Sequence, residues 1–175
     1  MKLVLKFGGT SLASPKDITN VAKTVASFSK GNEIVVVCSA VDGVTDDLIL
    51  ISKMIEQKKE KDVAKTLDEL IKKHRKLAMQ TIKNSEIEAP LMEKLNADVS
   101  ELQELVRGLT LLKEVSARSL DYLISFGERL SDDLVSFALQ DIKKKSTALN
   151  GKEVGIVTDS NFGESRPLMD TTRIR

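Results

Sequence analysis

The sequence predicts an α/β fold built on a parallel sheet, and three observations lead to this prediction. Residues 2–7 alternate apolar and basic side chains and favour an extended strand. Residues 33–38, Glu-Ile-Val-Val-Val-Cys, form an apolar, β-branched run typical of a strand buried on both faces of a parallel sheet. Apolar residues recur at helical spacing between the two. Strand, helix and strand in this order predict a right-handed βαβ unit.

Composition narrows the class of protein. The 175 residues suffice for one domain with its own core, and 41% hydrophobic and 30% charged residues are an ordinary globular balance. A net charge of +1, 3% aromatic residues and no Trp argue against a nucleic-acid partner. Cys38 is the only cysteine, so we expect no internal disulfide and no cysteine metal cluster. Neither a signal peptide nor an apolar run of membrane-spanning length is visible, so we expect a cytoplasmic protein without a membrane partner.

The first candidate site follows the first strand. Gly8-Gly9 let backbone N–H groups come close to an anion, and the hydroxyls of Thr10 and Ser11 come next. A following helix would aim the positive end of its dipole at the same point. Lys6 could place a mobile charge on a transferring phosphoryl group. Neither the P-loop order nor G-x-G-x-x-G is present, and the alternative is a joint whose glycines merely make a turn.

The next segment reads as a helix. Ser14 suits the N-cap, Pro15 the first position and Asp17 the first turn. Gly31-Asn32 end the segment. The apolar residues at helical spacing are Ile18, Val21, Ala22, Val25 and Phe28.

The second candidate site is the segment 39–47. It follows the carboxyl end of a predicted parallel strand, where open α/β sheets bind their ligands. Ser39 and Thr45 supply hydroxyls, and Gly43 frees the backbone. Thr45 can also cap a helix from 46 to about 57, and this capping role is compatible with a substrate contact.

Residues 57–115 predict two charged helices separated at Ala89-Pro90. Uneven leucine spacing favours an antiparallel hairpin packed on the sheet over a coiled coil. His74 falls on the apolar stripe, and we interpret it as structural because no acid or nucleophile motif lies beside it. The two apolar faces comprise Leu67, Leu70, Ile71, Leu77 and Ala78, then Leu91, Leu95, Val99, Leu102, Leu105, Val106 and Leu109.

The third informative stretch spans residues 119–131. Helical periodicity continues on both sides of Gly127, and a glycine there costs up to about 1 kcal/mol relative to Ala. We interpret Gly127 as a break that admits a ligand and presents Glu128. A carboxylate suits a substrate ammonium, and Arg129 suits a carboxylate or an ion pair. A solvated Glu-Arg pair is the alternative, and the sequence leaves the two readings even.

The last part of the chain predicts short strands at 146–149 and 154–159 and a loop at 161–167. Residues 171–175 read as the opening of another helix or strand.

Three of these stretches together resemble the N-terminal signatures of aspartate kinases: K-F-G-G-T-S from Lys6, S-A-V-D-G-V-T-D from Ser39 and S-F-G-E-R-L-S from Ser125. The resemblance runs over essentially all 175 residues and covers less than half of a complete enzyme. It implies a three-layer αβα sandwich with a mainly parallel sheet, the amino-acid-kinase or carbamate-kinase-like fold. We therefore expect residues 1–175 to be a truncated N-terminal portion of the kinase domain, with a helical insertion at about 57–145 and without the second half or the ACT domains.

The resemblance also implies a reaction: transfer of the ATP γ-phosphoryl group to the β-carboxylate of L-aspartate, the first step toward lysine, threonine and methionine. Mg²⁺ would accompany ATP, with no metal ligand expected in this chain. Asp42-Gly43 differs from the glycine pair or Met-Gly of many relatives, and no role is assigned to Asp42. The implied roles are catalysis for Lys6, phosphate binding for Lys6, Gly8, Gly9, Thr10 and Ser11, and substrate binding for Ser39, Thr45 and Glu128.

We expect this chain alone to be inactive, and to form a homo-oligomer through an exposed strand edge. Two alternatives stay open. One is another enzyme of the same fold, acting on glutamate, acetylglutamate or a nucleotide, which S-F-G-E-R-L-S disfavours. The other is a non-catalytic interaction module. A Rossmann unit is disfavoured by the glycine spacing.

Overall fold

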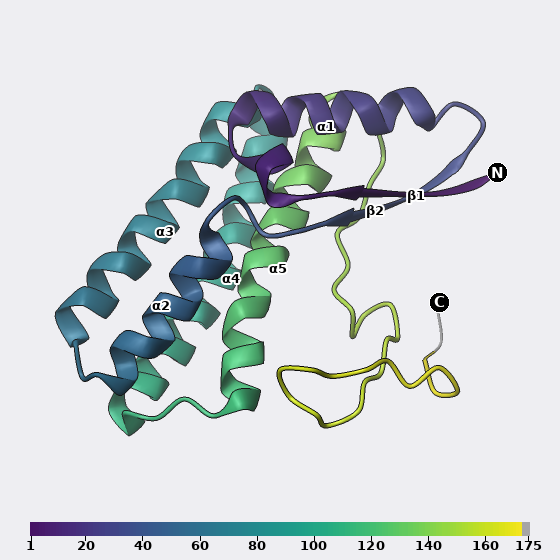
Figure 1. The fold of residues 1–175 in the computed structure, drawn as a ribbon. Coiled ribbons are helices and arrows are strands. Elements are labelled where there is room, and N and C mark those ends of the chain that lie inside the picture. The colour runs from purple at the N-terminus through teal and green to yellow at the C-terminus, as the bar shows by residue number, and fades with distance from the viewer. Residues whose placement is uncertain (173–175) are drawn as a thin grey trace.

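A computed structural model describes residues 1–172 (Figure 1). The chain begins with a strand, a short 3₁₀ helix, an α-helix and a second strand, and four further α-helices follow. The elements in chain order are β1 (Lys2–Phe7), η1 (Gly9–Leu12), α1 (Pro15–Phe28), β2 (Glu33–Cys38), α2 (Val44–Glu56), α3 (Glu60–Thr81), α4 (Ser85–Leu112) and α5 (Ala117–Asp141).

β1 and β2 are parallel neighbours, joined through α1, as the sequence predicts. Their register runs from Lys2 opposite Glu33 to Phe7 opposite Cys38. The Ser39 N–H extends the ladder by donating to the Phe7 carbonyl oxygen at 3.0 Å. Figure 1 shows α1 running along the pair. The α/β class and the parallel sheet are confirmed.

The two faces of this sheet differ. Side chains that alternate along each strand pack against the core on one face, among them Leu5, Phe7 and Val36. The other face carries Val4 and Val35, which are 69% and 57% exposed. The expectation that residues 33–38 are buried on both faces is therefore wrong for the described residues, because helices cover only one face of the pair there.

The hairpin of α3 and α4 is present, but its boundary differs from the prediction. Asn84, not Ala89-Pro90, begins α4, and its side chain accepts from the Glu86 N–H at 3.0 Å. Asp141 at the end of α5 accepts from the backbone N–H groups of Lys83 and Asn84, at 3.2 and 2.9 Å. These bonds satisfy the amides of the turn, so the chain turns there and Pro90 lies inside α4.

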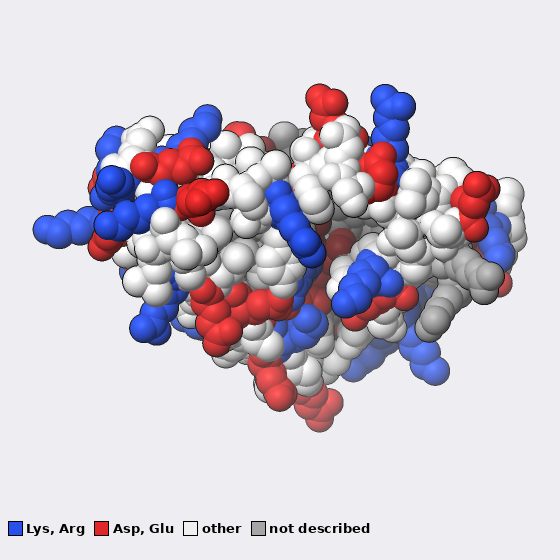
Figure 2. Space-filling model, turned by 90° about the horizontal axis from the view of Figure 1, so that it is seen from below, with Lys and Arg blue, Asp and Glu red and all other residues white. Residues whose placement is uncertain are grey.

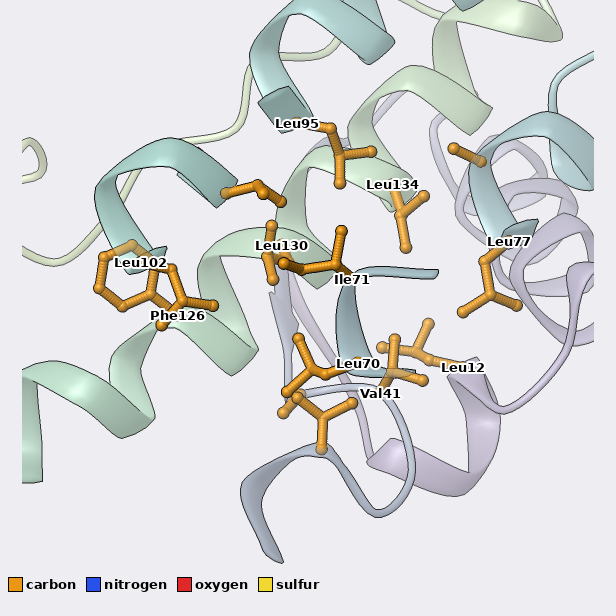
Figure 3. Packing of buried hydrophobic residues seen from close by; sticks show 14 of the residues in the cluster. Leu12, Val41, Leu70, Ile71, Leu77, Leu95, Leu102, Phe126, Leu130 and Leu134 are labelled. Carbon is orange, nitrogen blue, oxygen red and sulfur yellow. The ribbon is translucent and has the colours of Figure 1, made fainter. Parts of the chain in front are cut away.

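The hairpin packs against other helices rather than on the sheet. α4 lies along α5, and α3 contacts α2 and α1. Figure 3 shows the apolar side chains that fill the space between these helices. Leu12 of η1 and Val41 after β2 belong to the same core, so the segments that carry the first two candidate sites are anchored in it. No helix within residues 1–172 combines the length and apolarity needed to cross a bilayer.

His74 lies fully inside this core. Its Nδ1 is 2.9 Å from the Leu70 carbonyl oxygen, and its Nε2 has no hydrogen-bond partner among the described residues. This environment supports the structural interpretation.

The segment after α5 forms neither of the two predicted strands. An isolated bridge between Thr158 and Pro167 is the only strand-like pairing in the described part of the segment. The first part of this segment passes across β1 and β2 in the view of Figure 1, but none of its described residues pairs with either strand. Ser146 bonds to Ser136 and Gln140 and holds its first part against α5. The loop at 161–167 is confirmed, and the expected new element lies largely in 173–175, outside the described residues.

We predict a pH-dependent stability that His74 controls. Burial lowers the pKa of His74 below its ordinary 6.5, helped by the charge of Lys73. A lowered folded-state pKa contributes stability above pH 6.5 that is lost as pH falls toward the folded value. Relative to His74→Leu, the unfolding free energy of the wild type should fall by up to about 1.4 kcal/mol between pH 7.5 and 5.5. Urea unfolding at both pH values measures this, and an unchanged difference would contradict it.

Candidate active site

The segment Ser39–Gly43, here the β2–α2 loop, is where the three motif stretches meet. The glycine turn after β1 touches it from one side. A Cβ placed on Gly9 would lie 2.9 Å from the Ala40 carbonyl oxygen and 3.4 Å from the Asp42 Cα. Only glycine permits this backbone approach. Gly8 is extended, and a Cβ there would meet nothing within 4 Å.

α5 touches the same loop from another direction. The Ser131 hydroxyl donates to the Ser39 carbonyl oxygen at 2.7 Å, and Glu128 Oε1 accepts from the Ala40 N–H at 3.3 Å. A Cβ on Gly127 would lie 2.7 Å from the Ala40 Cβ. α5 is continuous through Gly127, so the predicted helix break is wrong. The missing side chain of Gly127 makes room for Ala40 of the β2–α2 loop rather than for a ligand.

The loop ends in a turn that begins α2. The Val44 N–H donates to the Val41 carbonyl oxygen at 2.9 Å, and Gly43 has φ 76° and ψ −10°. Gly43 is the N-cap residue and makes no side-chain cap, so Thr45 does not cap α2 as predicted. Thr45 lies in the first turn instead. No hydrogen bond of the described residues uses the hydroxyls of Thr45 or Ser39, and both side chains are half-buried.

Lys6 and the glycine turn adjoin this loop without bonding to its functional groups. Lys6 is exposed opposite Val37, on the bare face of the sheet. Thr10 and Ser11 lie in η1, which has four residues, and α1 begins only at Pro15, so the predicted long helix does not follow the glycines directly. Among the described residues, no hydrogen bond or ion pair involves the ammonium group of Lys6. The structure therefore places Ser39 in the β2–α2 loop, Thr45 in the first turn of α2 and Glu128 on α5 against the loop, with the glycine turn beside them.

The sequence analysis assigned no site role to two groups near Glu128, the Asp132 carboxyl group and the Cys38 thiol. Asp132 lies one helical turn after Glu128. Burial, then the charge of Glu128, raises the pKa of Asp132 to about 6. Burial, then the charge of Asp132, raises the pKa of Cys38 to about 12, so the thiol is not a nucleophile at neutral pH. The sequence signal that could have indicated these acids is the pair Asp132-Asp133, which lies between two apolar residues of the helix, Leu130 and Leu134.

Arg129 points elsewhere, toward α4. Its guanidinium lies 2.5 Å from Asp98 and 2.6 Å from Glu101, and 4.3 Å from the centre of the Phe126 ring. Lys94 also binds Asp98, at 2.9 Å. Of the interpretations left open for Glu128-Arg129, a structural ion pair therefore fits Arg129.

Figure 2 shows acidic and basic side chains interspersed on one face of the molecule, with acidic atoms inside a central hollow.

The part of the chain that the structure describes was searched for a metal site. Among residues 1–172, no three His, Cys, Asp or Glu side chains are grouped to hold an ion. We therefore assign no residue of this chain to Mg²⁺.

Comparison with known proteins shows the family of this chain. The model of the Amino acid kinase family matches residues 1–173. The chain belongs to the amino acid kinase family. Chloroplastic aspartokinase 3 of Arabidopsis thaliana is 33% identical over 160 residues, which are 91% of this chain and 27% of that protein. The aspartokinase of Geobacillus stearothermophilus is 27% identical over 99% of this chain and 29% of its own length.

A solved relative shares the fold. The crystal structure of E. coli aspartokinase III with aspartate and ADP superposes with a TM-score of 0.83 at 22% identity, over 98% of this chain and 36% of that one. The resemblance to aspartate kinases is thus confirmed for this member of the amino acid kinase family. The chain spans roughly a quarter to a third of the length of these relatives.

Gly127 gives a prediction about stability. Gly127→Ala should lower the unfolding free energy by about 1–3 kcal/mol, because the added Cβ collides with Ala40. Gly108→Ala is the matched control, since a Cβ on Gly108, near the C-terminal end of α4, would meet nothing within 4 Å. That variant should gain about 0.5–1 kcal/mol from helix propensity. Urea unfolding measures both, and equal effects would contradict the packing explanation.

Asp132 gives a second prediction. Because the Glu128 charge helps to raise the pKa of Asp132, Glu128→Gln should lower that pKa from about 6. Burial should keep it above the ordinary 3.8. A carboxyl-carbon NMR titration measures the change, with the exposed Glu104→Gln as control. An unmoved Asp132 pKa in Glu128→Gln would show that the two carboxylates do not interact.

Proposed function

We propose that this chain carries the aspartate-binding and phosphate-binding portion of an aspartate kinase. The product would be 4-phospho-L-aspartate, which feeds the synthesis of lysine, threonine and methionine in the cytoplasm. The observation that carries the proposal is the convergence of Glu128 and two unused hydroxyls on the β2–α2 loop. Membership of the amino acid kinase family and a relative solved with aspartate and ADP support it.

Glu128 would bind the α-ammonium of aspartate. One carboxylate oxygen already accepts from the Ala40 N–H, and no described hydrogen bond uses the other. That second oxygen can accept from an ammonium group in a charge-assisted bond. Asp132, with its pKa of about 6, is mostly ionised at pH 7 and adds negative potential nearby. The hydroxyls of Ser39 and Thr45 would donate to the substrate carboxylates.

Phosphoryl transfer would take place beside the glycine turn. A β-carboxylate oxygen attacks the γ-phosphorus of ATP, the new O–P bond forms, and the bond to the β-phosphate oxygen breaks to release ADP. The substrate is its own nucleophile, so the protein needs only to position the groups and stabilise charge. Lys6 would contact the transferring group. The unused N–H groups of Gly8 and Gly9, with the hydroxyls of Thr10 and Ser11, would hold phosphate oxygens.

A second candidate is an interaction module without activity of its own. The exposed valines on the bare face of the sheet favour it, because parallel strands are normally covered on both faces. We propose that this face supports self-association as a homo-oligomer. Sedimentation over a range of concentrations tests this, and a monomer at all concentrations would contradict it.

The kinase proposal predicts two separable losses. Calorimetry should show that Glu128→Gln weakens aspartate binding by about tenfold or more, since a charged hydrogen bond is lost. Glu104→Gln, exposed on α4, should bind like the wild type. If the wild-type chain releases ADP from ATP·Mg²⁺ when aspartate is present, this release should disappear in Lys6→Ala and persist in Lys2→Ala, whose lysine is exposed on the same strand.

The results divide the two candidates. Aspartate binding that Glu128→Gln does not weaken would contradict the substrate assignment. Binding without ADP release would place this chain as a substrate-side module.

A further inference from the structure

The helical region reaches the β2–α2 loop through one side chain. Lys73 of α3 donates from Nζ to the Asp42 carbonyl oxygen at 2.5 Å, across 31 positions of sequence. The side chain of Lys73 is half-buried, while the next residue, His74, is fully buried in the core. The core thus fixes the helix face from which Lys73 extends.

This bond bears on the type of turn that precedes α2. Residues 41–44 form a turn closed by the Val44 N–H, and φ 76° with ψ −10° at Gly43 is the signature of type II. Types I and II differ by a flip of the central peptide unit, which here carries the Asp42 carbonyl and the Gly43 N–H. Lys73 binds that carbonyl in the type II orientation. Its ammonium is also 3.9 Å from the place where a Gly43 Cβ would stand.

The opposite end of the same peptide unit matters for binding. A trans peptide is planar, so its C=O and N–H point in opposite directions. With the Asp42 carbonyl held toward α3, the Gly43 N–H points away from α3. No hydrogen bond of the described residues uses this N–H. The Gly43 N–H is therefore a free donor, and Gly43 lies between Ser39 and Thr45 in the sequence.

We propose that Lys73 is a positioning residue that holds the Asp42–Gly43 peptide so that the Gly43 N–H is presented to a substrate carboxylate. The inference rests on the proposed function for its ligand. Lys73 contacts the loop and not the substrate. Because α3 lies outside the βαβ unit, this contact means that the helical region helps to position the residues of the site.

Lys73→Met tests the proposal, because methionine keeps much of the stem and removes the ammonium. Lys72→Met is the matched control, since Lys72 is exposed and pairs only with Asp68, at 2.6 Å. Amide hydrogen exchange at Val44, whose N–H closes the turn, should quicken by about tenfold in Lys73→Met, and the aspartate Kd should rise by a similar factor. Lys72→Met should change neither, and Lys73→Arg should restore both in part.

Each outcome is decisive. An equal exchange rate at Val44 in the two methionine variants overturns the proposal. Faster exchange with an unchanged aspartate Kd overturns the link to the substrate. A wild-type chain that does not bind aspartate refutes the proposed function instead, and the exchange rates still decide whether Lys73 holds the turn.

Discussion

Ala40 is held between two glycines, and the arrangement of the whole site depends on that contact. Gly9 lies against its carbonyl oxygen and Gly127 against its Cβ, each closer than a side chain would allow. The first glycine belongs to the turn after β1 and the second to α5. If either residue carried a Cβ, the β2–α2 loop would have to move away from the glycine turn or from α5. The two absent side chains therefore set the distance between the glycine turn after β1 and Glu128.

α5 serves two neighbours at once because successive helical residues point about 100° apart. Gly127, Glu128 and Ser131 face the β2–α2 loop, while Arg129 faces the charged groups of α4. The ion pairs of Arg129 fix the rotation of the helix about its axis. That rotation determines where the Glu128 carboxylate lies, so charges remote from the loop contribute to its geometry.

Local sequence signals predicted the local structure, and distant contacts account for the failures. The alternating strand, the Ser14 N-cap and the βαβ order were readable because they depend on neighbours in the chain. The start of α4 was not, since Asp141 satisfies the turn from almost 60 positions away. The convergence of the three motifs followed from the family resemblance, but the reason for Gly127 required Ala40, and the part played by Lys73 required α3. The apolar runs after residue 145 have the composition of strands, but their described residues pair with neither β1 nor β2, and composition alone does not determine that pairing.

The bonds from α5 to the β2–α2 loop join residues 88 and 92 positions apart. Contacts within the hairpin of α3 and α4, and between α4 and α5, close much shorter loops and require less ordering of the chain before they form. The helices should therefore assemble early during folding, and the loop that carries Ser39 should dock last. The same entropy should make the β2–α2 loop the first region to open in the native protein. The site would then be the region that is least stable against local opening.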